Sequence, residues 1–307
     1  MSMETRFALD PATVAAAVRE ACLAELRAFK PGNVSFASAG HGMQAADFVA
    51  SAHAVAGIIA APAAGVGERI LRAIESTRTV INLNTNLGIV LLCAPLVQAA
   101  MQLSAERSLR LRLDRVLAAL DVTDAELAFS AIRLARPGGL GESDRYDVSQ
   151  TPRVTLLEAM REARQRDRIA AQYVTRYHDV LETGVPVARR AARRWGRADW
   201  VAVTVYLAFL SRFADSHIAR KHGNETAFAV TREAGELEML LAGSTDPGEA
   251  MPMLEAFDRR LKARSVNPGT SADLTVATLF AMDLDDLLDA AFRAQARQAG
   301  IGEPAGR

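Results

Sequence analysis

Apolar residues recur every three to four positions through most of the chain, which is the spacing of one face of an α-helix. Helical patterns cover residues 12–29, 45–61, 65–79, 89–101, 104–120, 123–134, 155–182, 185–197, 225–241, 249–264 and a last stretch from Asn267 through Leu288. The sequence has no alternating run rich in Val, Ile and Thr, which would indicate a β-strand. The pattern therefore predicts an all-α protein.

Trp200–Leu210 is a long apolar run, and a helix that carries it would be buried on most of its surface. The most apolar windows of the chain are Val49–Ala64 and Leu87–Ala100. We expect a single multi-helix catalytic domain over residues 1–297, with a central buried helix core and a polar cleft lined by loops. Residues 298–307 contain three glycines and a proline, and we expect a flexible tail there.

The 36 basic and 36 acidic side chains cancel, so no overall positive field attracts a polyanion. Five arginines lie between Val185 and Arg197, at spacings typical of a solvated helix face. Nucleic acid is therefore not an expected partner, and phosphate binding must be local. The oligomeric state is left open, with a homodimer through an apolar helix face as one option.

Cys22 and Cys93 each lie inside an apolar helical pattern and read as small buried hydrophobes, not as a disulfide or a metal pair. The first residues lack the basic-then-apolar pattern of a signal peptide. The most apolar windows are shorter than a membrane span and contain prolines. We expect a cytoplasmic protein with no membrane partner.

The densest group of charges is Ser211–Gly223, which follows the apolar run ending at Leu210 and contains Asp215, His217, Arg220 and Lys221. If these groups lie in the protein interior or in a cleft, their charges need partners such as an anionic ligand and a metal ion. The alternative is an ordinary helix C-terminus, where basic side chains favour the negative end of the dipole.

Three further polar segments adjoin predicted helices: Lys30–Met43, Asn82–Gly88 and Asn267–Asp273. Free backbone N–H groups and carboxamides at a helix N-terminus can bind phosphate, although a plain capping turn has the same composition. Glu25 lies on or beside an apolar stripe, as either an edge residue or a ligand-facing one. The long irregular segment from Arg136 to Pro152 carries Glu142, Asp144 and Asp147, which are dense enough for Mg²⁺ or typical of a flexible acidic loop.

Taken in order, these segments resemble the ATP:dephospho-CoA triphosphoribosyltransferase family, which makes the prosthetic-group precursor of citrate lyase and malonate decarboxylase. The resemblance spans nearly the whole chain. It is carried by Lys30-Pro-Gly with Val34, His41…Met43…Asp47-Phe48…Ser51-Ala52, Asn84-Thr85…Gly88, Gly138-Gly-Leu-Gly, Asp215-Ser-His with Arg220, and Asn267-Pro-Gly-Thr-Ser-Ala-Asp-Leu274.

The resemblance implies an all-α fold and a Mg²⁺-dependent transferase for small nucleotide substrates. The ribose 2′-hydroxyl of dephospho-CoA attacks C1′ of ATP, and adenine leaves. The implied catalytic residues are Asp47, Asp215, Glu25, His41 and His217, with the two histidines as acids to the departing base. The residues implied to contact substrate and phosphate are Lys30, Asn33, Ser35, Ser51, Asn84, Thr85, Asn86, Arg220, Lys221, Thr270 and Ser271. The implied metal ligands are Asp47, Asp144, Asp215 and Asp273.

Two positions depart from the citrate lyase branch of the family, where His-Lys stands in place of Asn86-Leu87. This departure leaves a second hypothesis, a related transferase in the biosynthesis of a methanofuran- or methanopterin-type one-carbon carrier. A third is a non-catalytic helical nucleotide-binding protein. The acids beside basic partners count against the third, because a scaffold has no need to bury them.

Overall fold

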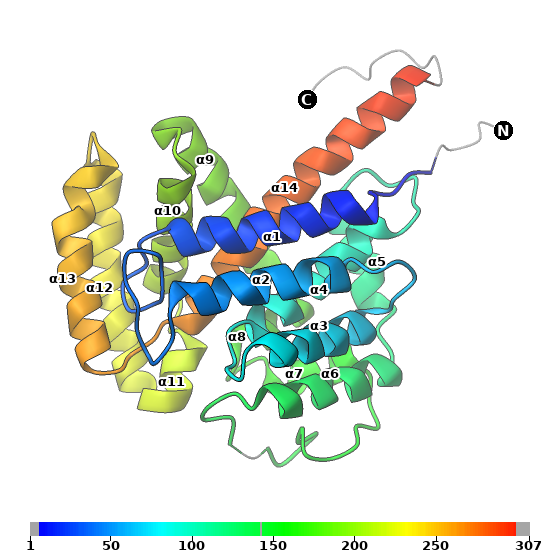
Figure 1. Ribbon diagram of the computed structural model, residues 1–307, viewed down its shortest axis with the longest axis horizontal. Helices are drawn as coiled ribbons and strands as arrows, with labels where there is room; N and C mark the ends of the chain where they lie inside the picture. The colour runs from blue at the N-terminus through cyan, green and yellow to red at the C-terminus, as the bar shows by residue number, and fades with distance from the viewer. Residues whose placement is uncertain (1–5, 142, 299–307) are drawn as a thin grey trace.

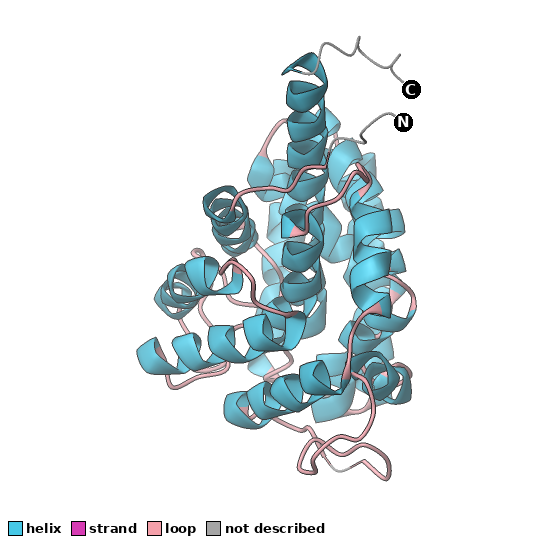
Figure 2. Cartoon of the chain, turned by 90° about the vertical axis from the view of Figure 1, so that its right-hand side faces the viewer, coloured by secondary structure: helices cyan, strands magenta, loops and turns pink. Residues whose placement is uncertain are grey.

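The computed structural model describes residues 6–141 and 143–298 and is built from helices (Figure 1). The α-helices are α1 (Pro11–Arg27), α2 (Ala45–Ile59), α3 (Val66–Val80), α4 (Leu87–Met101), α5 (Leu109–Ala118), α6 (Val122–Ala135), α7 (Leu156–Ala163), α8 (Arg168–Val174), α9 (Val185–Trp195), α10 (Ala198–Arg212), α11 (Ser216–His222), α12 (Asn224–Gly243), α13 (Met251–Ala263) and α14 (Gly269–Gln298). A π-helical turn, η1 (Asp179–Gly184), and a 3₁₀ turn, η2 (Pro247–Ala250), complete them. Within the described ranges no strand occurs (Figure 2), so the all-α prediction is confirmed.

The centre of the molecule is formed by α4, α10 and the first half of α14. Twelve of the fifteen residues of α4 and ten of the fifteen residues of α10 are buried, and the burial of α10 agrees with its apolar run Trp200–Leu210. The helix α14 packs against both of them. On one side α1, α2 and α3 lie in succession, and on the other α9 and α12 cover α10 (Figure 1).

The helix predicted over residues 155–182 is wrong, because the chain is broken there into α7, α8 and η1. Two buried tyrosines at the break belong to the core. Pro95 inside α4 has no N–H to offer the carbonyl of Leu91 four residues earlier. The Tyr173 hydroxyl donates to that carbonyl (2.6 Å), and the Tyr177 hydroxyl donates to the Leu92 carbonyl (2.9 Å). Tertiary hydrogen bonds thus decide where this segment turns.

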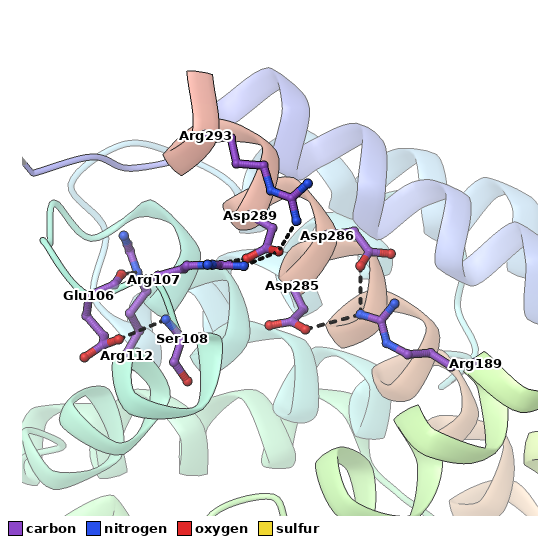
Figure 3. Close-up of polar contacts among 9 residues, drawn as sticks. All are labelled: Glu106, Arg107, Ser108, Arg112, Arg189, Asp285, Asp286, Asp289 and Arg293. Carbon is purple, nitrogen blue, oxygen red and sulfur yellow. Dashed lines mark hydrogen bonds and ion pairs between the residues drawn. The ribbon is translucent and has the colours of Figure 1, made fainter. Parts of the chain in front are cut away.

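The second half of α14 packs on the core through Leu284 and Leu288 and is also held by arginines from two other elements (Figure 3). Arg189 of α9 bonds Asp286 (2.7 Å) and Asp285 (3.2 Å). Arg107, in the loop before α5, makes a two-point ion pair with Asp289. These contacts fix the direction of a helix that also carries Asp273 near its first turn.

Several element boundaries follow directly from local sequence. Asp10 caps α1 by accepting from the Thr13 N–H (2.9 Å), with Pro11 as the first helical residue. Of the expected tail 298–307, Gln298 is the last residue of α14 and the others lie outside the described residues. No helix in the described parts of the chain is long and apolar enough to cross a membrane.

Candidate active site

The polar segments separated in sequence meet around one pocket of about 270 Å³. Its wall is formed by the end of α1, the loop between α1 and α2, the segment before α4, the start of α8, helix α11 and the start of α14. Eleven of the residues singled out in the sequence line it: Glu25, Asn33, His41, Asn84, Thr85, Asn86, His217, Arg220, Lys221, Thr270 and Asp273. The fold therefore brings most of the predicted site residues together.

Asp273 is the pocket carboxylate that packs directly against a glycine. It lies just after the first turn of α14, against Gly88 at the start of α4, where a β-carbon on residue 88 would come 2.0 Å from its Oδ2. No hydrogen bond or ion pair to Asp273 exists among the described residues, although its side chain reaches the pocket wall. It is a partly buried acid free to meet a ligand.

The surroundings of Asp273 disfavour its charged form. Burial raises its pKa well above the usual range of an aspartate, and the negative charges of Glu25, Asp215 and Asp167 raise it further. Arg220 acts in the opposite direction. A carboxyl group in a pocket whose surroundings raise its pKa in this way is a candidate general base.

Glu25 reaches the same pocket from the last turn of α1, with only 5 % of its surface exposed. Burial raises its pKa, and its ion pair with Lys30 (3.1 Å) partly offsets that effect. Lys30 itself lies away from the pocket. Its ammonium donates to the carbonyls of Glu25 (2.9 Å) and Val34 (2.9 Å), so it closes the end of α1 and fixes Glu25 instead of meeting a phosphate.

Asp215 also lies outside the pocket, in contrast to its predicted catalytic and metal-binding role. Its Oδ1 accepts from the N–H groups of His217 (2.9 Å) and Ile218 (3.2 Å), which caps α11. Its Oδ2 accepts from the backbone and the hydroxyl of Ser271, each at 2.8 Å. Both oxygens and Ser271 are thus used to join α11 to α14. Asp215 positions the site and does not face the ligand.

Two histidines face the pocket, and the surroundings of both lower the pKa of the ring and so disfavour its charged form. The pKa of His217 is lowered to about 3 by burial and by the positive charges of Lys221 and Arg220. Its Nε2 is buried and has no partner among the described residues. His41 Nε2 lies 2.7 Å from the Gly32 carbonyl, and burial lowers its pKa as well. At neutral pH both rings are neutral and can act as hydrogen-bond partners.

The cationic side of the pocket comes from α11. Arg220 forms an ion pair with Asp167 (3.4 Å) and donates to the Gly138 carbonyl (3.3 Å). Lys221 has no carboxylate partner within the described residues, and burial beside Arg220 lowers its pKa. Asp167 did not stand out in the sequence as a site residue. Its only local signal is its place before α8, whose first N–H groups it caps.

The segment before α4 supplies amides and a hydroxyl. Asn84 Oδ1 accepts from the Leu87 N–H (3.2 Å), and the hydroxyls of Thr85 and Ser51 lie 2.5 Å apart. Asn86 donates its amide to Thr77 (2.9 Å), which leaves its buried Oδ1 without a partner among the described residues. That oxygen can accept a hydrogen bond from a ligand.

Four other predicted site residues do not line this pocket. Asp47 caps α2 by accepting from the Gln44 N–H (2.7 Å), Ser51 lies behind the wall, and Ser35 is buried in the loop between α1 and α2. Asp144 is exposed in the loop after α6, and Glu142 of the same acidic run lies outside the described residues. The four predicted metal ligands are not gathered, and the described residues contain no group of three or more side chains placed to hold an ion.

Comparison with known proteins identifies the architecture. The family model described as ATP:dephospho-CoA triphosphoribosyl transferase matches residues 11–292. The chain belongs to this family. A solved structure described as a triphosphoribosyl-dephospho-CoA synthase from Archaeoglobus fulgidus has the same fold, with a TM-score of 0.56 and 24% identity, over 77% of this chain and 96% of that one. No curated protein matches the chain.

Membership of this family makes the protein a transferase, and it agrees with the resemblance carried by the polar segments. The matched residues include every element that lines the pocket. The pocket is therefore the candidate active site of a triphosphoribosyl transferase.

Proposed function

We propose that this pocket transfers the triphosphoribosyl group of ATP to dephospho-CoA. A ribose hydroxyl of dephospho-CoA attacks C1′ of ATP, and its oxygen forms a new bond to that carbon. The bond between C1′ and the adenine nitrogen breaks, and adenine leaves with the bonding electrons and takes up a proton. The observation that carries the proposal is the partly buried carboxyl group of Asp273, which has no partner among the described residues and faces a pocket with Arg220 and Lys221.

Asp273 is assigned as the general base for the attacking hydroxyl. Its pKa is raised above that of an ordinary aspartate, which makes it a stronger base, and it packs closely on Gly88 in the pocket wall. Displacement at an anomeric carbon passes through an oxocarbenium-like state, which a nearby negative charge stabilises. Glu25 supplies a second buried carboxylate on the same wall.

The triphosphate is assigned to the side of the pocket formed by α11 and α4. Lys221 and Arg220 bring positive charge there, and charge-assisted bonds to phosphate are stronger than neutral ones. The N-terminal end of α4, next to Asn84 and Thr85, adds backbone N–H groups. His217 Nε2 and Asn86 Oδ1, both buried and unpartnered in the described chain, are the groups assigned to hydrogen bonds with the ribose or the base.

Mg²⁺ is proposed as the metal ion, held by substrate phosphates and one or two carboxylates of the pocket. Mg²⁺ binds in this way when it accompanies a nucleotide. Asp167 lines the pocket, near enough for its charge to raise the pKa of Asp273, and it would hold the ion while Asp273 acts as the base. A bound ion would supply positive charge against the triphosphate. Asp47, Asp144 and Asp215 do not fit this role, because they lie away from the pocket.

A chromatographic assay for free adenine tests the proposal. Purified protein is mixed with Mg²⁺, ATP and dephospho-CoA, and we expect adenine only when dephospho-CoA is present. Asp273→Asn should lower the release at least about a hundredfold, whereas Asp144→Asn should leave it within about twofold, because Asp144 is exposed and does not line the pocket. Adenine release by Asp273→Asn at the normal rate would remove Asp273 from the chemistry.

A different acceptor is the second candidate, and Leu87 favours it. Its apolar side chain lines the pocket where the citrate lyase branch of the family has a lysine. An acceptor without a charge at that point, such as a one-carbon carrier precursor, would fit the same site. ATP binding without adenine release in the presence of dephospho-CoA would support this reading.

A further inference from the structure

A second and larger cavity, of about 760 Å³, adjoins the active-site pocket. The two cavities share six lining residues: Leu91, Ile132, Leu140, Asp167, Ile169 and Arg220. They meet at the ion pair between Asp167 and Arg220. At about 270 Å³, the active-site pocket lies below the usual range for even one drug-sized ligand, so two nucleotides need the neighbouring space.

The charge of this second cavity is strongly positive. Besides Arg220, its wall carries Arg145, Arg164, Arg166, Arg168 and Arg212, against two acids, Asp147 and Asp167. Arg168 and Arg212 are neutralised by Asp179 (2.7 Å) and Glu238 (2.6 Å). We call this cavity the basic groove.

Arg164 and Arg166 are the two cations of the basic groove that lack a carboxylate within ion-pair distance in the described chain. Arg166 donates only to the Ser143 hydroxyl (2.8 Å) and the Glu162 carbonyl (3.4 Å), both of them neutral. Both arginines lie at the end of α7, on one side of the groove. This pair is a place where an anion can add charge-assisted hydrogen bonds without displacing an existing partner.

The rest of the basic groove is apolar and aromatic. Phe129, Tyr146, Phe213 and Phe228 line it, and Phe228 exposes 61 % of its surface. The Arg168 guanidinium stacks over the Phe213 ring, 3.6 Å from its centre. A ligand that matches this wall combines a phosphate-bearing centre with a planar ring or an apolar arm.

We infer that the basic groove binds the acceptor nucleotide, with its diphosphate on Arg164 and Arg166 and its apolar arm along Phe228. This inference rests on the proposed function. The acceptor's ribose then reaches the active-site pocket across the junction formed by Asp167 and Arg220, which places its hydroxyl on the side where Asp273 lies. The reacting ribose and the triphosphate of ATP occupy the smaller pocket, and the two substrates meet without sharing a phosphate site.

Steady-state kinetics of the double variant Arg164→Ala/Arg166→Ala tests the inference. We expect the KM for dephospho-CoA to rise at least about tenfold, since hydrogen bonds to charged groups contribute that much binding, and the KM for ATP to stay within about twofold. Arg161→Ala is the matched control. Arg161 lies on the same helix, is exposed and lines neither cavity, so both constants should be unchanged.

Phe228→Ala tests the apolar part independently, and its exposure means that the fold does not depend on it. It should raise the KM for dephospho-CoA and leave that for ATP unchanged. A double variant that turns over with both constants unaltered would overturn the assignment while the proposed function stands. So would a rise in the KM for ATP alone.

Calorimetric titration of dephospho-CoA into the protein without ATP separates the two proposals. Binding that weakens in Arg164→Ala/Arg166→Ala but not in Arg161→Ala supports the groove assignment, even if no adenine is released in the turnover assay. In that case the proposed reaction fails and the diphosphate site remains. Binding that is equal in all three proteins contradicts the groove assignment.

Discussion

The carboxylate of Asp273 packs so closely on the backbone of Gly88 that a β-carbon at residue 88 would lie 2.0 Å from its Oδ2. Gly88 is in the first turn of α4, where the positive end of the helix dipole favours an anion. Burial and three neighbouring acids act against that anion. The dipole of α4 therefore favours the ionised form of Asp273, whereas burial and the neighbouring acids favour the protonated form. Both effects depend on the close contact between Asp273 and Gly88.

Gly88→Ala should lower kcat at least about a hundredfold, since a displacement of the order of 1 Å is enough for such a loss. Gly57→Ala, at an exposed position in the last turn of α2, is the control. No atom lies within 4 Å of the added methyl group there, and the variant should be as active as the parent and equally or more stable. A Gly88→Ala protein with normal kcat would show that the position of Asp273 is not critical.

The dependence of kcat/KM for ATP on pH should show a fall on the acid side. Asp273 must be ionised to act as a base, and its pKa in the free enzyme is well above that of an ordinary aspartate. Activity should therefore be lost as pH decreases through this raised value. Asp273→Asn should lose activity by about a hundredfold or more, and its residual rate should lack this limb. Asp144→Asn should retain the parent profile.

Thermal unfolding of the protein without substrate should also report the raised pKa of Asp273. Between the unfolded pKa of Asp273 and its raised folded value, the folded protein binds more protons than the unfolded chain. The contribution of this carboxyl to stability is complete at low pH and is lost as pH rises through the folded pKa. Asp273→Asn should thus gain more in Tm over the parent at pH 8 than at pH 4. Equal differences at both pH values would contradict the raised pKa.

Asp215→Asn should behave in the opposite way and lower Tm at pH 7 by several degrees. The amide nitrogen would face donors that now bond a carboxylate oxygen, and losing buried hydrogen bonds of this kind costs roughly 2–4 kcal/mol. Activity per folded molecule should survive at low temperature. A normal Tm with abolished turnover would instead place Asp215 in the chemistry.

The ring of His217 should not titrate between pH 5 and 8, because its pKa is about 3. NMR of protein labelled at histidine measures this directly, with His217→Asn identifying the signal. The pKa of His217 is low because the ring is buried against Gly269 and because the positive charges of Lys221 and Arg220 oppose its protonation. A titration midpoint near 6.5 would mean that the ring is solvated.

Local sequence predicted the fold wherever the decisive contacts are local. Asp10 and Pro11 begin α1 as expected, and the apolar runs became the central helices. The break after α8 could not be predicted, since it depends on the hydroxyls of Tyr173 and Tyr177 reaching carbonyls more than 80 residues earlier.

The candidate site shows the same division. Segment composition located the pocket, because loops rich in Asn, Gly and Thr do converge there. It could not assign Asp215, whose Oδ2 is occupied by Ser271, 56 residues away. Nor did it find Asp167, whose importance lies in a contact to Arg220, 53 residues away. Which oxygen is free to react depends on partners distant in sequence.

Helix α14 is continuous from Gly269 to Gln298, so it connects its two ends rigidly. Asp273 is at one end, and the acids held by Arg107 and Arg189 lie along the other (Figure 3). Asp289 is about 24 Å from Asp273 at 1.5 Å per residue. Exposed ion pairs weaken as salt increases, whereas close packing does not. The orientation of Asp273, the proposed general base, is thus stabilised in part by distant ion pairs whose strength depends on the salt concentration around the protein.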